Sequence, residues 1–196
     1  MKKDDALKLL QRQAQDGFIL RKKIVDELGP RILEVANNIS AVFGSGGKIL
    51  VAGNGGSAAD ASHFTAELVV RLTADRNRQA LPAICINVDP SVITAAANDF
   101  GFEMAIARQV EALGNRGDLL FVISTSGNSE NLIRAVSIAR ERGLVTAGLL
   151  GRRGGRLAEQ VDRAIIVPHD STQRIQEEHI FIIHFLVEMV ESDLFG

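Results

Sequence analysis

Two histidines, a glutamate and a glutamine, in two separate segments of this chain, are of types that could carry chemistry. His63 and Glu67 are four residues apart, so on a helix they would share one face a turn apart. Gln176 and His184 are eight residues apart, a little over two helical turns, and would point in broadly similar directions. Imidazole and carboxylate groups serve as zinc ligands or as general acids and bases, whereas a neutral amide is an uncommon zinc ligand.

Each of these residues also has a purely structural interpretation. A histidine and a glutamate four residues apart commonly do no more than stabilise a helix. His184 stands in the apolar sequence Ile-Ile-His-Phe-Leu, where a histidine is often a hydrogen-bonded core residue. His179 follows Gln176 by three residues and competes for its role, and His169 follows Pro168 in a predicted loop. Spacing alone therefore does not select this set.

Two short segments have the composition of phosphate-binding loops. The first is Gly-Asn-Gly-Gly-Ser at 53–57, where glycines let backbone N–H groups turn toward one point at the start of a helix. The second is Ser-Thr-Ser-Gly-Asn-Ser at 124–129, whose hydroxyl and amide groups can donate hydrogen bonds to phosphate oxygens without a lysine. Either segment alone could be an ordinary capped turn between a strand and a helix, but the presence of both favours an anion site.

The first loop also fits the loose dinucleotide pattern Gly53-x-Gly55-x-x-Ala58. The next predicted strand ends near Asp89, however, well beyond the offset of about 20 residues at which a ribose-binding acid is expected. NAD binding therefore stays a weak alternative. The chain has no Gly-x-x-x-x-Gly-Lys-Ser/Thr segment, which excludes a match to an NTPase P-loop.

Five short apolar runs separated by helical stretches predict the buried strands of a parallel sheet in an α/β fold. They are the segments 49–52, 83–88, 119–123, 145–150 and 164–167. Both loops follow such runs, so they are expected at the carboxyl ends of strands, where open α/β folds bind their ligands. A final helix is predicted from about Thr172 to Leu194; it is apolar on more than one face, which favours burial in a core or between subunits.

Before the first strand, apolar residues between Asp5 and Phe43 recur mostly at helical spacings, and Gly29-Pro30 interrupts them. This pattern predicts two helices. Because no strand precedes them, they must bury their apolar sides against the later domain or against another copy of the chain, and a homo-oligomer is expected.

The composition, 46% hydrophobic and 23% charged residues, predicts a globular core and excludes a disordered chain. A net charge of −2 and the absence of Trp and Tyr disfavour a nucleic-acid ligand. The only cysteine, Cys85, lies in an apolar run and suits a reducing cytosol. The N-terminal stretch that begins with Met1 lacks the apolar segment of a signal peptide, and no later stretch reaches the length of a membrane span, so a cytoplasmic location is expected.

Four segments, in this order, closely resemble the phosphoheptose isomerases, which are sedoheptulose 7-phosphate isomerases of the sugar-isomerase (SIS) family. They are Gly-Asn-Gly-Gly-Ser at 53–57 followed by His63 and Glu67, Asn-Asp-Phe-Gly at 98–101, the second loop at 124–129, and Arg-Ile-Gln-Glu at 174–177 with His184. The resemblance implies a single SIS domain over 1–196, with a helical extension at 1–45 and an α/β core at 46–196. It further implies a three-layer αβα sandwich of flavodoxin type with a five-stranded parallel sheet, a homotetramer with active sites near subunit interfaces, and no nucleotide cofactor, nucleic acid or membrane partner.

The resemblance also implies roles for individual residues. Those implied to contact a sugar phosphate are Asn54, Gly55, Gly56, Ser57, Asn98, Asp99, Ser124, Thr125, Ser126, Ser129 and Gln176. Those implied to hold one zinc ion per subunit are His63, Glu67, Gln176 and His184. The implied reaction converts sedoheptulose 7-phosphate into D-glycero-D-manno-heptose 7-phosphate through an enediol, the first step toward the activated heptoses of bacterial surface polysaccharide, including lipopolysaccharide.

Such an isomerisation needs a base that takes a proton from carbon, an acid that protonates oxygen, and stabilisation of the enediolate between them. We assign the base to Glu67 and the acid to His184, with zinc as a Lewis acid on the carbonyl. The alternative is a non-catalytic SIS-domain protein of the kind that associates with the replication initiator. Relatives of that kind lack parts of the acid and base set, whereas this chain retains all four residues, which favours the enzyme.

Overall fold

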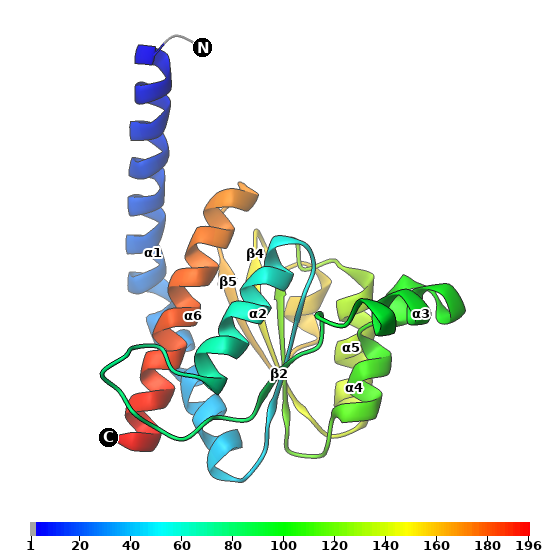
Figure 1. The fold of residues 1–196 in the computed structure, drawn as a ribbon. Helices are drawn as coiled ribbons and strands as arrows, with labels where there is room; N and C mark the ends of the chain where they lie inside the picture. The colour runs from blue at the N-terminus through cyan, green and yellow to red at the C-terminus, as the bar shows by residue number, and fades with distance from the viewer. Residues whose placement is uncertain (1–2) are drawn as a thin grey trace.

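The computed structural model describes residues 3–196, so Met1 and Lys2, which open the predicted helical extension, lie outside the described residues. The helices and strands, in chain order, are α1 (Lys3–Gly44), β1 (Ile49–Gly53), α2 (Gly56–Val69), β2 (Ala83–Cys85), α3 (Pro90–Phe100), α4 (Ala107–Leu113), β3 (Leu119–Ser124), α5 (Glu130–Glu141), β4 (Val145–Gly151), β5 (Arg163–Val167) and α6 (Thr172–Phe195). Two 3₁₀ turns, η1 (Phe102–Met104) and η2 (Arg156–Glu159), complete the path drawn in Figure 1.

The five predicted strands form one parallel sheet in the order β2-β1-β3-β4-β5, which confirms the predicted fold class. In this order β1 lies between β2 and β3, with Val51 paired to Cys85 on one side and to Phe121 on the other. Chain connections leave β1 and β3 in opposite directions, so their carboxyl ends form the switch point at which flavodoxin-type sheets bind ligands. Strand β2 ends at Cys85, earlier than predicted, because Asn87 bonds the backbone of β1 through its side chain instead of its main chain.

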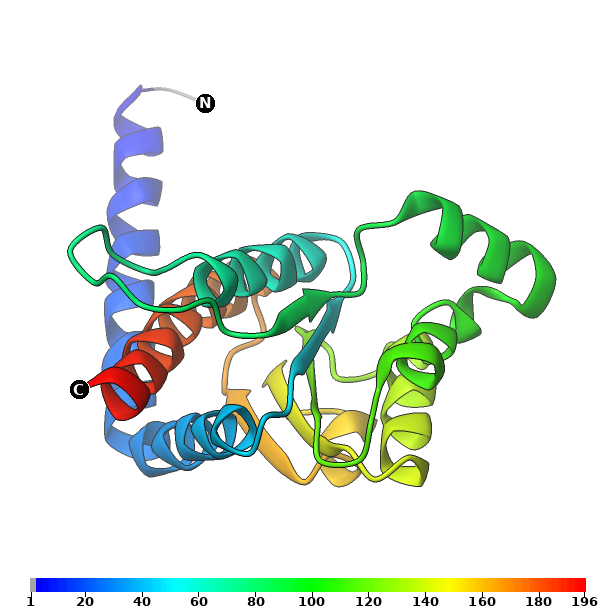
Figure 2. The ribbon, with the colours of Figure 1, turned by 60° about the horizontal axis from the view of Figure 1, so that its bottom comes forward.

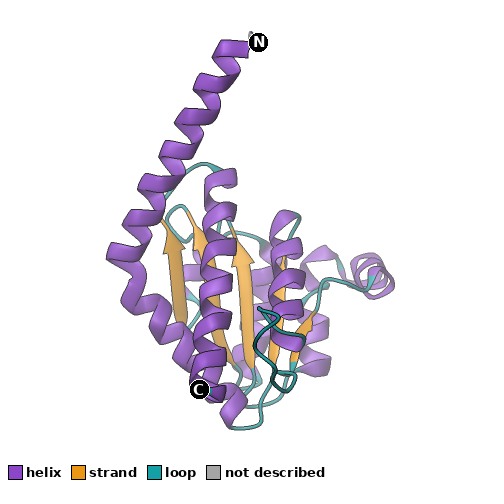
Figure 3. Cartoon of the chain, turned by 60° about the vertical axis from the view of Figure 1, so that its left-hand side comes forward, coloured by secondary structure: helices purple, strands orange, loops and turns teal. Residues whose placement is uncertain are grey.

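Alternate residues of each central strand enter different layers, as the pleat of a strand requires. On one face Ile49, Val51 and Phe121 pack in a core with α1, α2 and α6. On the other face Leu50 and Val122 pack in a second core with α4 and α5. Figures 2 and 3 show the sheet between these two helical layers, so the predicted three-layer sandwich is confirmed.

The prediction of two N-terminal helices is wrong, because α1 runs unbroken from Lys3 to Gly44 with Pro30 inside it. A proline within a helix removes one backbone hydrogen bond and bends the helix, but packing on both sides can hold the helix together. Buried residues of α1 lie before Pro30, at Leu20 and Ile24, and after it, at Ile32 and Val35. Figure 3 shows the helix changing direction partway along its length.

Helix α3 projects from the body of the molecule, as Figures 1 and 2 both show. Its start is fixed by Asp89, whose Oδ1 accepts the N–H groups of Ser91 and Val92 at 2.8 and 3.2 Å. The side chains of Phe100 and Phe102, at and just after its end, are more than half exposed. None of the helices within residues 3–196 combines the length and apolar character that crossing a membrane requires.

Candidate active site

The first glycine loop connects β1 to α2 and lies at the carboxyl edge of the sheet. Gly55 has a φ of 56°, a conformation that glycine adopts without strain. Helix α2 then begins at Gly56, and the helix start has no side-chain cap. The Ser57 and Ala58 N–H groups donate to the Asn54 and Gly55 carbonyl oxygens, both at 3.0 Å, so an anion is favoured here by the positive end of the helix rather than by those two donors.

Two asparagines from neighbouring segments hold this loop in place. Asn87 accepts from the Gly53 N–H and donates to the Gly53 carbonyl, both at 2.8 Å. Asn131, at the start of α5, exchanges two amide hydrogen bonds of 2.9 Å with Asn54. The loop is thus fixed from both sides, which prepares its backbone for a ligand before the ligand arrives.

The second loop, after β3, is ordered by hydrogen bonds that its own hydroxyl oxygens accept. Ser124 Oγ accepts the Gly127 N–H at 3.1 Å, and Ser126 Oγ accepts the Asn128 N–H at 3.2 Å. A hydroxyl group that accepts in this way still has its own O–H to donate. The hydroxyl groups of Ser124 and Ser126 therefore each keep one O–H to donate, and those of Thr125 and Ser129 make no hydrogen bond in the part of the chain described.

Helices α2 and α6 bring together three of the four residues with metal-ligand or acid–base chemistry. His63 Nε2 lies 2.8 Å from His184 Nε2, across a sequence separation of 121 residues. The Glu67 carboxylate lies 3.8 Å from the same His63 nitrogen. Its second oxygen, Oε2, is buried without a hydrogen-bond partner. A buried carboxylate oxygen in this position has unused capacity for a proton, a substrate hydroxyl group or a cation.

Gln176 is brought to the first loop. A Cβ atom built on Gly56 would lie 2.2 Å from Gln176 Nε2, so the glycine backbone and the amide are in direct contact. Two helical turns, about 12 Å along the axis of α6, separate Gln176 from His184. The contact favours the predicted substrate role of Gln176, beside the glycine loop.

The donor set fits zinc in its chemistry. Two nitrogens bound to one tetrahedral zinc ion lie about 3.3 Å apart, so a shift of about 0.5 Å between His63 and His184 would make room for the ion. The unpartnered Glu67 oxygen is a suitable third ligand. Within residues 3–196 no three His, Cys, Asp or Glu side chains already surround one point as metal ligands, so the side chains would move on binding.

Asp60 is a residue near the site that the sequence patterns did not single out. It lies one turn before His63 on α2, and its Oδ2 is buried without a partner. Burial raises the pKa of Asp60 to about 6, although a charge on His63 would act in the opposite direction. Asp60 therefore adds a second carboxyl group, close to half-protonated near pH 6, to the helix that bears His63 and Glu67.

The two competing histidines have structural roles. His179 is fully buried in α6, with Nε2 3.2 Å from the Leu150 carbonyl oxygen. Burial lowers the pKa of His179 to about 4, so the imidazole is neutral near pH 7. His169 Nδ1 accepts the Ser171 N–H at 2.9 Å and thereby orders the entry into α6.

Asn98 and Asp99 stand apart from the two loops in this chain. Both are exposed on the projecting helix α3, and Asn98 Nδ2 donates to Asp99 Oδ1 at 2.7 Å. No hydrogen bond joins either side chain to the loops in the part of the chain that the structure describes. Their predicted substrate contacts therefore require either movement of α3 or a site formed with another chain.

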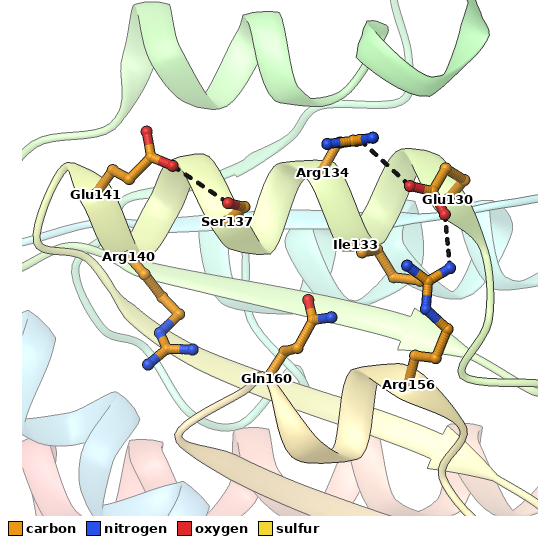
Figure 4. Close-up of a pocket in the computed structure, with 8 residues that line it drawn as sticks. All are labelled: Glu130, Ile133, Arg134, Ser137, Arg140, Glu141, Arg156 and Gln160. Carbon is orange, nitrogen blue, oxygen red and sulfur yellow. Dashed lines mark hydrogen bonds and ion pairs between the residues drawn. The ribbon is translucent and has the colours of Figure 1, made fainter.

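Two surface hollows lie beside α5. One, of about 550 Å³, includes Asn54 and Ser129 from the two loops, together with Phe102 and Arg134. The other, of about 650 Å³, lies between α5 and η2 and contains none of the predicted site residues (Figure 4). In that second hollow the Glu130 carboxylate forms ion pairs with both Arg134 and Arg156. These pairs offset part of the positive charge of the two arginines.

The residues that sequence reasoning missed are Asp60, Asn87 and Asn131. Asn87 could have been predicted as a site residue, because it is the one polar residue in the apolar run 83–88. Asn131 follows the second loop and has no distinguishing signal in the sequence. Its importance depends on the contact with Asn54, which only the folded chain creates.

Comparison with known proteins gives a family for this arrangement. The SIS domain matches residues 18–151, more than half of the chain. A phosphoheptose isomerase of Trichlorobacter lovleyi is 46% identical over 187 residues, covering 95% of this chain and 94% of that protein. A phosphoheptose isomerase of Geobacter sulfurreducens is 50% identical over 183 residues, covering 93% and 96% of the two chains.

Solved structures agree with this assignment of the fold. A phosphoheptose isomerase from Neisseria gonorrhoeae has a TM-score of 0.90 at 37% identity and covers 95% of this chain and 99% of its own. A phosphoheptose isomerase from Francisella tularensis has a TM-score of 0.91 at 35% identity, with 95% and 98% coverage. The similarity thus extends over nearly the whole of each chain.

Proposed function

The chain belongs to the phosphoheptose isomerases of the SIS-domain family, and we propose that it converts sedoheptulose 7-phosphate into D-glycero-D-manno-heptose 7-phosphate. It is an aldose–ketose isomerase. The structural observation that carries the proposal is the meeting of His63 and Glu67 of α2 with His184 of α6. The alternative, a non-catalytic binding protein, gives no reason for a carboxylate with a buried, unpartnered oxygen beside two imidazoles.

The two loops and Gln176 bind the substrate in this proposal. Phosphate is a group that the positive end of α2 and the hydroxyl groups of the second loop can stabilise without a lysine. Gln176, in contact with Gly56, supplies an amide that can hydrogen-bond both an oxygen acceptor and a hydroxyl donor of the sugar. These contacts support the roles proposed for the two loops, from Asn54 to Ser57 and from Ser124 to Ser129.

Glu67 acts as the base. Its carboxylate takes a proton from C1 of the ketose, which gives the 1,2-enediol, and returns a proton to C2, which gives the aldose. The buried and unpartnered Oε2 supports this assignment, because no hydrogen bond needs to be broken before the oxygen accepts a proton.

His184 acts on the oxygen atoms. It donates a proton to O2 as the ketone becomes a hydroxyl group and receives one from the O1 hydroxyl as the aldehyde forms. A neutral imidazole with one protonated nitrogen can do both, and the contact with His63 fixes the ring. A zinc ion held by His63, Glu67 and His184, with Gln176 as a fourth ligand once its amide leaves Gly56, would supply Lewis-acid polarisation of the carbonyl oxygen.

A homotetramer with sites near subunit interfaces is part of the proposal. The N-terminal half of α1 exposes Leu10, Phe18 and Ile19, which are each more than half exposed. The projecting helix α3 exposes Val92 and Phe100, and Phe100 directly follows Asn98 and Asp99 in the chain. Exposed apolar side chains on α1 and α3 favour a partner, and a second copy on α3 would receive two of the residues implied to bind substrate.

The remaining parts of the proposal concern the cellular setting. We place the enzyme in the cytoplasm, at the first step toward activated heptoses for bacterial surface polysaccharide such as lipopolysaccharide. Cys85 is a buried free thiol, as is usual for proteins of a reducing compartment. Residues 1–196 act as one SIS domain, which the shared core of α1, the sheet and α6 supports.

The test is a coupled assay of the purified protein with sedoheptulose 7-phosphate, with and without added zinc. Formation of the aldose heptose 7-phosphate supports the proposal, and activity that rises with zinc supports the metal assignment. The absence of turnover at every zinc concentration would overturn the proposed enzymatic function and favour the non-catalytic binding protein. The rate with fructose 6-phosphate in the same assay measures how strongly the enzyme prefers a seven-carbon to a six-carbon ketose phosphate.

A further inference from the structure

A buried ion pair joins the two helices on which the proposed acid and base stand. The loop between α2 and β2, residues 70–82, passes the C-terminal ends of α2 and α6 (Figures 1 and 2). In this loop Arg78 has a side chain only 1% exposed, and its Nε donates to Glu191 Oε1 of α6 at 2.7 Å. The Glu191 side chain is 2% exposed.

Arg78 also closes the end of α2. Its Nη2 donates to the Glu67 carbonyl oxygen at 2.7 Å, and its Nη1 donates to the carbonyl oxygens of Leu68 at 2.9 Å and Gln79 at 3.0 Å. The last carbonyls of a helix have no partner within the helix, and a cation is favoured beside them. One guanidinium group therefore holds the backbone of the residue proposed as the base.

Glu191 completes the connection on the side of α6. It lies seven residues after His184, about two turns further along the helix. Besides Arg78 it accepts the Leu72 N–H at 3.3 Å, and Arg76 Nε lies 4.0 Å from its second oxygen. The loop thus fastens the last turn of α2 to α6 at a distance from the substrate loops.

We propose that Arg78 is a positioning residue for the isomerisation: with Glu191 it fixes the end of α2 against α6 and so sets where the Glu67 carboxylate stands relative to His184. The inference rests on the proposed function. A displacement of about 1 Å between reacting groups can cost as much as ~100-fold in rate, so a fixed end of α2 matters even though Arg78 touches no substrate.

Lysine cannot replace Arg78 in this role. The guanidinium group presents several N–H donors in a fixed plane, which here reach three carbonyl oxygens and one carboxylate. An ammonium group is a single point of charge on a flexible stem and cannot bridge the same span. Arg78→Lys therefore keeps the charge opposite Glu191 but releases the end of α2.

The matched control is the partly buried ion pair between Lys48 and Asp118, with side chains 22% and 5% exposed. These residues precede β1 and β3, so the pair lies at the amino edge of the sheet, opposite the two loops. Lys48→Met removes a buried interaction without touching α2 or α6. It shows what a loss of stability alone does to the kinetics.

The experiment measures kcat and KM for sedoheptulose 7-phosphate with saturating zinc, at a temperature well below the unfolding midpoint of each variant. We expect Arg78→Lys to lower kcat about tenfold or more with KM within about twofold, because the substrate loops are not moved. Lys48→Met keeps the kcat of the unmodified protein. Amide hydrogen exchange is expected to rise at the last turn of α2 in Arg78→Lys only.

An Arg78→Lys protein that turns over with unchanged kcat would overturn the proposal. Should that variant fail to fold, Glu191→Gln carries the test, because its amide oxygen still accepts from Arg78 but without charge. A kcat lowered about threefold or more supports the positioning role, and an unchanged kcat contradicts it. If the unmodified protein itself fails to turn over, the proposed function is wrong, which is a separate result.

Discussion

The Nε2 atoms of His63 and His184 lie 2.8 Å apart, although the two residues belong to different helices and are separated by 121 positions in the chain. One of the two nitrogens must donate and the other accept, so the pair holds one shared proton in its neutral form. Glu67 approaches the same His63 nitrogen at 3.8 Å. A proton carrier and a carboxylate base are thus placed side by side where α2 and α6 pack together.

Asn131→Ala is expected to weaken substrate binding through Asn54. The substitution removes both amide hydrogen bonds and leaves the Asn54 side chain without partners, at a cost of about 1–3 kcal/mol in the free energy of unfolding. The first loop loses one of its two supports, so KM should rise more than kcat falls. Steady-state kinetics and a denaturant titration measure both effects. Asn38→Ala, which removes a partly buried hydrogen bond to the Glu34 carbonyl oxygen within α1, is the control and should leave KM unchanged.

Gly56→Ala is expected to displace Gln176. The new Cβ would lie 2.2 Å from Gln176 Nε2, and because that atom ends a flexible side chain the protein can fold by moving the amide away. We expect KM to rise about fivefold with little loss of stability. Gly44→Ala is the matched control, since nothing lies within 4 Å of its added Cβ. Equal KM values for the two alanine variants would contradict the role of Gln176 at the first loop.

His179 is expected to make the protein less stable in acid. Its pKa is lowered to about 4 in the folded protein, from 6.5, so between these values the unfolded chain binds a proton that the folded chain does not. The free energy of unfolding therefore falls as pH falls from about 6.5 to about 4, by about 3 kcal/mol. Asp60, with a raised pKa, has the opposite slope between about 4 and 6. Urea titrations of His179→Gln and the unmodified protein across this range isolate the histidine, and parallel curves would refute the prediction.

Asp99 on α3 is expected to serve the site of a neighbouring subunit. Asp99→Ala and Glu67→Gln chains should each be inactive alone, but mixed oligomers should regain a fraction of the activity. In a mixed oligomer, the Asp99→Ala chain supplies an intact Glu67 and the Glu67→Gln chain supplies an intact Asp99. A site formed between these two chains therefore contains both residues. Co-expression with two affinity tags and assay of the doubly purified oligomer tests this arrangement. Mixed oligomers without activity would show that both residues serve the same chain.

The layers of the fold could be predicted from the sequence because burial leaves a direct pattern. Unbroken apolar runs such as 119–123 occur where both faces of a strand are covered, and all five such runs are strands. The predicted break at Pro30 is wrong, because the packing of α1 on α6 keeps the helix continuous through the proline. The early end of β2 also depends on a contact, between Asn87 and Gly53.

The site was predictable only in part. The spacing of His63 and Glu67 is local and correctly predicted a shared helix face, but their approach to His184 depends on how α2 and α6 pack. Asn131 and Arg78 act through partners 77 and 113 residues away, and no spacing rule reaches so far. Their contribution is to hold other site residues, which a sequence pattern of reactive groups does not reveal.

The most direct test of the central claim is proton exchange at carbon, followed by NMR in D₂O with sedoheptulose 7-phosphate. The unmodified protein should produce the aldose heptose 7-phosphate and incorporate deuterium at C1 of the ketose or C2 of the aldose, because the proton passes through the base. Folded Glu67→Gln should do neither. Deuterium incorporation by Glu67→Gln at an unchanged rate would contradict the assignment of the base, and the absence of both product and exchange with the unmodified protein would contradict the isomerase.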